Sequence, residues 1–168
     1  DIHATNPYEG REPRFYASIL YNGASWKGRT IEAYEGGRDG WGLGGNTTST
    51  GYYIRKFMDE DMIDFKENDY TYYYMRYAEV LLIYAEAMAQ QGFVKEALIE
   101  LNNVRNRVHL PAVEATTIDQ FMIHLRHERM VELAFEGHRF WDLRRWNLAK
   151  STLNNTHLKG KKPIRQAD

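Results

Sequence analysis

Hydrophobic and polar positions along the chain follow two different patterns, and the change falls near residue 72. Before it, short apolar runs are separated by turn signals rich in Gly, Pro and Asn. After it, apolar residues recur with the period of an amphipathic helix. The pattern therefore predicts an irregular region (residues 1–71), a helical region (residues 72–150) and a polar tail (residues 151–168), all within one domain of a longer protein.

Four helices are expected in the helical region because glycines and a capping box divide the periodic pattern. Gly92 and Gly137 suit helix ends, and Thr117 with Gln120 has the composition of a capping box at a helix start. The apolar spacing of the first two helices matches the packing positions of a tetratricopeptide repeat. Such repeats need neighbours to bury their faces, which indicates a piece of a longer helical scaffold. The expected helices cover residues 72–92, 93–108, 117–136 and 138–150.

Two short runs in the irregular region suit β-strands. One ends the apolar-aromatic stretch from Arg14 to Tyr21, and the other extends from Gly51 to Phe57. We expect them to pair as a small β-hairpin. The predicted fold class is therefore mainly α, with tetratricopeptide-like helical hairpins, a long irregular N-terminal region and this small β-hairpin.

A long loop rich in Gly, Trp and Tyr separates the two predicted strands. Loops of this length are uncommon inside a compact domain and tend to be functional or disordered. Sugar rings stack their apolar faces on Trp and Tyr, while Asn, Asp and Arg side chains bond their hydroxyls. The alternative, that these aromatic residues only pack the loop onto the scaffold, stays open. The residues proposed to bind a ligand are Trp26, Tyr34, Arg38, Asp39, Trp41 and Asn46.

The composition and net charge of the chain argue against several classes of function. The net charge is −1, which gives no electrostatic reason to expect nucleic acid or an anionic membrane as a partner. Cysteine is absent, which excludes disulfides, thiolate metal sites and a cysteine nucleophile. No apolar run is long enough to span a bilayer.

Three short motifs match functional patterns only in part. Residues 40–45 have the letters of a dinucleotide-binding glycine motif, but no helix is expected to follow them. His127 begins a zinc-protease pattern whose second histidine is replaced by Val131. Four clustered carboxylates fail the calcium-loop pattern and favour a solvated acidic turn, although calcium stays open; they are Asp59, Glu60, Asp61 and Asp64. We therefore expect no metal site and no cofactor.

Charged and large apolar residues are interleaved between His127 and Trp146. On a helix, glutamates spaced four residues apart form one stripe. Neighbouring arginines favour the ionised carboxylate and suit ion pairing, whereas a glycosidase needs a carboxylate that can donate a proton. We therefore expect structural ion pairs that lock the third and fourth helices together, formed by Glu128, Glu136, Arg139, Asp142 and Arg145.

Three stretches of the chain resemble signature motifs of the SusD/RagB family, and they occur in the family order. Together they span most of the chain and are much more specific than any one of them alone. They are NPYEGREPRFY from Asn6, RYAEVLLIYAEA from Arg76 with LNNVRNR from Leu101, and ERMVELAFEGHRFWDLRRW from Glu128.

The resemblance implies a binding protein and not an enzyme. Family members are surface-exposed lipoproteins of the outer membrane of Bacteroidota, which capture oligosaccharides, or in some members peptides, for import through a SusC-type TonB-dependent transporter. Their helical scaffold carries long insertions that hold the ligand. The motifs identify the scaffold and transfer no ligand-contacting residue to this sequence.

The chain departs from the family pattern at both ends. It lacks the lipidated cysteine with which members begin, and nothing after Trp146 resembles the closing segment rich in Pro, Asn and Gln. We therefore expect both ends to be missing, including the lipid anchor that would be the only membrane attachment.

Two other classes of function stay open on the sequence. A tetratricopeptide-like adaptor would bind a peptide or protein in its groove. A glycan-active enzyme is less favoured, because only Glu35 and Asp39 offer a carboxylate pair in the aromatic loop.

Overall fold

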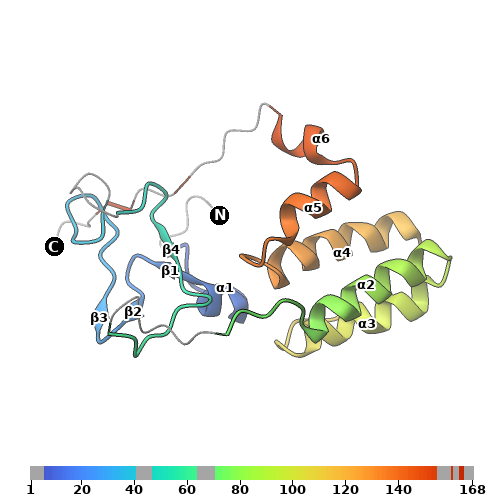
Figure 1. Ribbon diagram of the computed structural model, residues 1–168, viewed down its shortest axis with the longest axis horizontal. Helices are drawn as coiled ribbons and strands as arrows, with labels where there is room; N and C mark the ends of the chain where they lie inside the picture. The colour runs from blue at the N-terminus through green and yellow to red at the C-terminus, as the bar shows by residue number, and fades with distance from the viewer. Residues whose placement is uncertain (1–5, 41–46, 64–70, 155–159, 161–162, 165–168) are drawn as a thin grey trace. The chain divides into compact units, whose positions relative to one another are not determined.

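The computed structural model describes residues 6–40, 47–63, 71–154, 160 and 163–164. The chain divides into two compact units, residues 1–72 with 156–168 and residues 73–155. Helices dominate (Figure 1), which confirms the predicted fold class. Within the described residues, no helix combines the length and the apolar character needed to cross a membrane.

The N-terminal unit contains the predicted pair of strands. Helix α1 (Pro13–Ser18) starts with a proline, which suits a first helical position, and it leads directly into β1 (Ile19–Tyr21). Strand β1 pairs antiparallel with β4 (Tyr52–Ile54), with Leu20 opposite Tyr53. The pairing of the two apolar runs is therefore confirmed, although a long stretch of chain separates them.

A second hairpin in the same unit was not predicted. Strands β2 (Ser25–Trp26) and β3 (Arg29–Thr30) pair antiparallel across a two-residue turn. Both turn residues, Lys27 and Gly28, have positive φ, which matches the twist of the flanking strands. Strands of two residues are too short to show an alternating pattern. A small core lies beside this hairpin, formed by Leu20, Ala24, Ile31 and Ala33.

The helical unit has five helices among its described residues, and the breaks between them lie where the backbone turns left-handed. The third expected helix ends at residue 132 and not at 136, and Phe135 and Gly137 follow it with positive φ. The fourth divides in two at Asn147, which also has positive φ. The helices are α2 (Tyr77–Gln90), α3 (Val94–Asn106), α4 (Ile118–Glu132), α5 (His138–Arg145) and α6 (Ala149–Leu153).

Local capping signals define the start and end of these helices. The hydroxyl of Thr117 accepts from the backbone N–H of Gln120, whose side chain accepts in return, so the predicted capping box is confirmed. Gly92 has a φ of 91° just after α2 and gives the chain the left-handed turn into α3.

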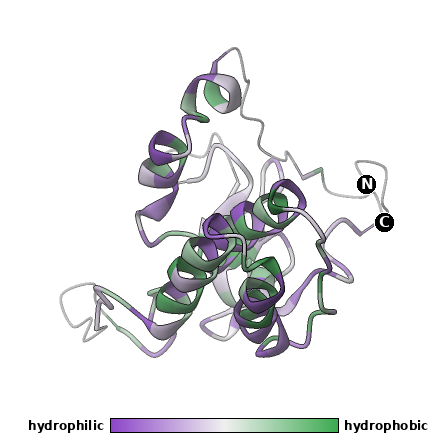
Figure 2. Cartoon of the chain, turned by 90° about the vertical axis from the view of Figure 1, so that its right-hand side faces the viewer, coloured by the Kyte–Doolittle hydropathy of each residue, from purple (hydrophilic) through white to green (hydrophobic). Residues whose placement is uncertain are grey.

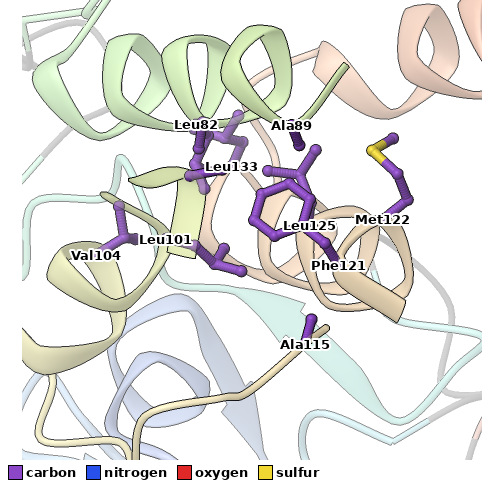
Figure 3. Packing of buried hydrophobic residues seen from close by; sticks show 11 residues of the cluster. Leu82, Ala89, Leu101, Val104, Ala115, Phe121, Met122, Leu125 and Leu133 are labelled. Carbon is purple, nitrogen blue, oxygen red and sulfur yellow. The ribbon is translucent and has the colours of Figure 1, made fainter. Parts of the chain in front are cut away.

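The core of the helical unit lies between α2, α3 and α4 (Figure 3). Leu82, Leu101, Phe121 and Leu125 are fully buried there, and each such side chain contributes about 1.5–3 kcal/mol by leaving water. Each of the longer helices carries both hydrophobic and hydrophilic residues (Figure 2), as expected for helices that bury one face.

Candidate functional site

Asp39, one of the predicted ligand residues, is held by a network of hydrogen bonds in the N-terminal unit. Arg29 donates from Nη1 and Nη2 to its two carboxylate oxygens at 2.6 and 2.7 Å. The backbone N–H of Glu32 donates to the same carboxylate at 2.9 Å. The bond from Arg29, together with that from Glu32, lowers the pKa of the Asp39 carboxyl against the opposing effect of burial. The carboxylate is therefore ionised and already well supplied with donors.

Two glycines hold the loop around Asp39 in a tight turn. The N–H of Gly37 donates to the carbonyl of Tyr34 at 2.9 Å, and the N–H of Gly40 donates to the carbonyl of Gly37 at 2.9 Å. A Cβ on Gly40 would collide with the carbonyl of Tyr34. Tyr34 is thus tied to the turn through its backbone, while Arg38 is exposed beside it.

Trp26 lies in β2 opposite Arg29 in β3. Its ring packs against the small core of the unit, and the guanidinium of Arg55 lies 5.6 Å from the ring centroid. The structure therefore brings Trp26 near the Asp39 network through Arg29. Trp41 and Asn46 lie outside the described residues. The ligand-binding role of all six residues stays a prediction.

A cavity of about 350 Å³ lies in the same unit, and the sequence did not single it out. Arg55 and Glu60 supply its charged groups, and their closest atoms, Nη2 and Oε2, are 3.4 Å apart. Aromatic residues on α1 and β1 supply much of the rest. The lining residues are Tyr16, Ile19, Tyr21, Ala24, Ser25, Arg55 and Glu60.

The two tyrosines of the cavity belong to a larger group of aromatic rings. The Tyr16 and Tyr21 centroids are 6.0 Å apart with an interplanar angle of 64°. Tyr21 also contacts Tyr8 and Phe15, at 4.5 and 5.4 Å between centroids. In the sequence, the apolar-aromatic stretch from Arg14 to Tyr21 was the signal for this cluster, since it contains Phe15, Tyr16 and Tyr21.

Two carboxylates of the acidic turn accept hydrogen bonds from backbone N–H groups. Glu60 accepts from the backbone N–H of Lys27 at 2.9 Å, and the N–H of Asp61 donates to Asp59 at 2.9 Å. Asp64 lies outside the described residues. Within the ranges that the structure describes, no three His, Asp or Glu side chains lie close enough together to hold a metal ion.

The residues predicted to form ion pairs lie in the helical unit, and some of their partners lie outside the third and fourth expected helices. Asp142 in α5 accepts from Nε of Arg129 in α4 at 2.9 Å, and both side chains are buried. Arg145 bridges Asp142 and Glu86, which lies in α2. Arg139 forms no ion pair with the part of this unit that the structure describes.

The other two predicted carboxylates pair with helices earlier in the chain. Glu128 accepts from Arg105 in α3 at 2.8 Å. Glu136 accepts from Nε and Nη2 of Arg76, just before α2, at 2.8 and 2.7 Å. Arg76 also donates to the buried carboxylate of Glu132 at 2.6 Å. Burial opposes the charge of Arg76, but its bonds to Glu136 and Glu132 outweigh this and raise its pKa.

Arg76 and Arg105 were not predicted as partners of these carboxylates. Both fall within the second of the three family-like stretches, so a motif-level signal was present. A sequence pattern pairs residues within one helix, whereas these pairs join positions 60 and 23 residues apart.

Comparison with known proteins identifies the scaffold. The sequence matches the model of the SusD family over residues 3–168, which is nearly the whole chain. The chain belongs to the SusD family.

Relatives of this SusD-family chain include two SusD-like proteins from Formosa agariphila. One is 40% identical over a match that covers 44% of this chain and 16% of the relative. The other is 33% identical and covers 55% of this chain and 20% of the relative.

Solved structures of SusD-like proteins share the fold. A SusD-like protein from Bacteroides fragilis matches 86% of this chain and 29% of its own length, with a TM-score of 0.76 and 36% identity. A second protein from the same organism, described as a SusD-like carbohydrate-binding protein, matches 86% of this chain and 30% of its own, with a TM-score of 0.77 and 32% identity. The chain thus spans less than a third of the length of these relatives.

Proposed function

We propose that this SusD-family chain takes part in capturing an oligosaccharide at the cell surface and that no bond of the ligand is broken. The observation that carries the proposal is the 32% identity, over 86% of the chain, to a SusD-like carbohydrate-binding protein. The N-terminal unit supports it with exposed polar groups beside aromatic rings, the combination that sugar recognition requires.

The partner in this proposal is a SusC-type TonB-dependent transporter, to which the captured glycan is delivered. The location is the outer surface of the outer membrane, with attachment through a lipid anchor. Membership of the SusD family supports both parts of this proposal. Co-purification of a SusC-type transporter with a tagged copy from native membranes would test the partnership. Recovery of the tagged protein without any such transporter would contradict it.

Native affinity electrophoresis tests the capture step directly. The chain is run through gels that contain a panel of polysaccharides, and the same samples are analysed for cleavage products. We expect at least one polysaccharide to retard the chain without being cleaved. Cleavage would favour the enzyme alternative, and a chain that runs freely through every gel would contradict glycan capture by these residues.

Substitution of Trp26 tests the predicted ligand residues within this proposal. Trp26 is half-buried and packs against the small core, so the variants are Trp26→Phe and Trp26→Ala, each checked for its circular dichroism spectrum. Weaker retardation of Trp26→Ala, with the fold retained and Trp26→Phe intermediate, supports stacking on this ring. Unchanged retardation of both variants removes Trp26 from the site.

A further inference from the structure

We propose that the cavity lined by Tyr16, Tyr21, Arg55 and Glu60 binds a short stretch of an uncharged glycan. This inference rests on the proposed function and adds to it a site and a ligand class. The volume of about 350 Å³ lies at the lower end of the range for small-molecule sites. The cavity therefore holds only a short stretch of a polysaccharide, and the remaining sugar units stay outside it.

The charged groups of the cavity are more exposed than the Arg29–Asp39 pair, and Glu60 also accepts from the backbone N–H of Lys27 at 2.9 Å through Oε1. The Arg29–Asp39 pair has two short bonds, and the Asp39 side chain is only 14% exposed. Arg55 and Glu60 are 3.4 Å apart, with side chains 38% and 41% exposed. Exposed pairs of this kind contribute little to stability, so a ligand displaces the contact between Arg55 and Glu60 at low cost.

The charges in the cavity wall are balanced, which favours a neutral ligand. The lining includes one cation, Arg55, and one anion, Glu60. A sugar hydroxyl both donates and accepts, so it bonds the carboxylate as a donor and the guanidinium as an acceptor. A uronate or sulfate group would bring a second anion beside Glu60 without a second cation to match it, which is unfavourable in a partly buried site.

The aromatic part of the wall is held in position before any ligand binds. The Tyr16 hydroxyl donates to the carbonyl of Tyr8 at 2.6 Å. Arg55 donates from Nη1 to the carbonyl of Tyr16 at 3.2 Å and packs on Trp26. A wall whose rings are already fixed loses little conformational entropy on binding, and it presents an apolar surface to one face of a sugar ring.

Affinity electrophoresis with charge variants tests this site. The gels contain neutral polymers (galactomannan, xyloglucan, laminarin, dextran) or uronate polymers (alginate, polygalacturonate). The variants are Arg55→Gln, Glu60→Gln and, as the matched control, Glu9→Gln. Glu9 is exposed and outside the cavity lining. Its substitution makes the same change in charge as Glu60→Gln without altering the cavity wall.

We expect a neutral polymer to retard the native chain and uronates to retard it little. Arg55→Gln should weaken the binding of the neutral polymer by about tenfold or more, the cost of losing a hydrogen bond to a charged group. Glu60→Gln should weaken it too and raise retardation by uronates, because Arg55 then lacks its counter-charge. Glu9→Gln should match the native chain in every gel.

The outcomes separate this site from the broader function. If a neutral polymer retards the native chain, but Arg55→Gln and Glu60→Gln bind it equally well, the cavity is not the site and glycan capture stands. If only uronates retard the native chain, the ligand class is wrong. If no polymer retards it, both the capture function and this site are overturned. Circular dichroism of each variant checks that loss of binding is not loss of fold.

Discussion

The contribution of a charged side chain to this protein depends on how deeply its ion pair is buried. Asp39 and Glu60 are both carboxylates paired with arginine in the N-terminal unit, yet only the Asp39 pair is short and shielded. In the helical unit, Arg76 donates to two carboxylates whose side chains are 1% and 5% exposed. Removing one member of a shielded pair takes a counter-charge from a buried group, so such pairs contribute more to stability than exposed ones.

Substitution of Asp39 by asparagine is expected to destabilise the chain in a pH-dependent way. Loss of the charged acceptor for Arg29 should lower the free energy of unfolding at pH 7 by about 1–2 kcal/mol. The folded-state pKa of Asp39 is depressed below its ordinary value of 3.8, so its stabilisation is present above that value and is lost as the pH falls through the folded pKa. Urea unfolding of both proteins should therefore converge in acid. A constant difference at all pH values would contradict this role.

Glu136→Ala is expected to lower the melting temperature. The change removes one of the two carboxylates that Arg76 contacts and leaves Glu132. Losing hydrogen bonds to a charged group in this way should cost about 1.5–3 kcal/mol. That corresponds to a shift of several degrees in a chain of this size. Glu114→Ala is the matched control, since Glu114 is exposed in the same unit. Equal melting temperatures for both variants would remove the structural role of Glu136.

At the scale of the element, short local signals set where helices begin and end, and packing sets which face is buried. The capping box at Thr117 begins α4, and the left-handed residues after position 132 end it. Along α4, Phe121 and Leu125 are fully buried, whereas Ile123 is 66% exposed. The apolar side chains of one helix therefore differ widely in what they contribute to the fold.

Loss of the Thr117 cap should destabilise α4. Thr117→Ala removes the acceptor for the N–H of Gln120, which should lower the free energy of unfolding by about 1 kcal/mol. Thr117→Ser keeps the hydroxyl and should restore most of it. Urea midpoints measure both, and a Ser variant as unstable as the Ala variant would show that the cap is not the cause.

Two truncations on α4 should have very different costs. Leu125→Ala creates a cavity in the core and should cost about 2–5 kcal/mol. Ile123→Ala removes an exposed side chain and should change stability by about 0.5 kcal/mol or less. Thermal unfolding of both variants tests this, and similar losses would contradict the placement of the core in Figure 3.

At the scale of the whole molecule, the chain carries a net charge of −1 and two units with separate cores. Its SusD-family relatives are at least three times the length of the region that matches, as coverages of 29% and 30% show. The scaffold motifs identify the family, while the proposed ligand site depends on the N-terminal unit. One of these motifs, from Asn6 to Tyr16, also lies in that unit and ends at a residue that lines the cavity, so the family match and the proposed ligand site share part of the chain.

Glycan binding should depend little on salt. A neutral ligand and a chain with almost no net charge leave no long-range attraction for ions to screen. The affinity for the retarding polymer should change by less than about twofold between low and high salt, because only screened surface contacts are affected. Affinity electrophoresis at the two ionic strengths measures it. A large loss at high salt would indicate a charged ligand.

Features that depend on neighbouring residues could be predicted from the amino-acid sequence alone. The capping box, the turn at Gly92 and the mainly helical fold were predicted because caps, glycines and a 3.6-residue period act over one or two turns of chain. The family motifs were visible in the same way. The pairing of β1 with β4 was also predicted, because an apolar-aromatic run and an alternating run flank the same loop.

Contacts between side chains that are distant in the sequence could be identified only in the folded chain. Arg76 and Glu136 are 60 positions apart, and no local pattern specifies such a pair. The same is true of Arg55, which lies beside Trp26 and Tyr16 through the pairing of β1 and β4. The sequence identified the loop as aromatic and polar. Burial and distance are properties of the folded chain, and they distinguish the short, shielded ion pair of Asp39 from the longer, more exposed one of Glu60.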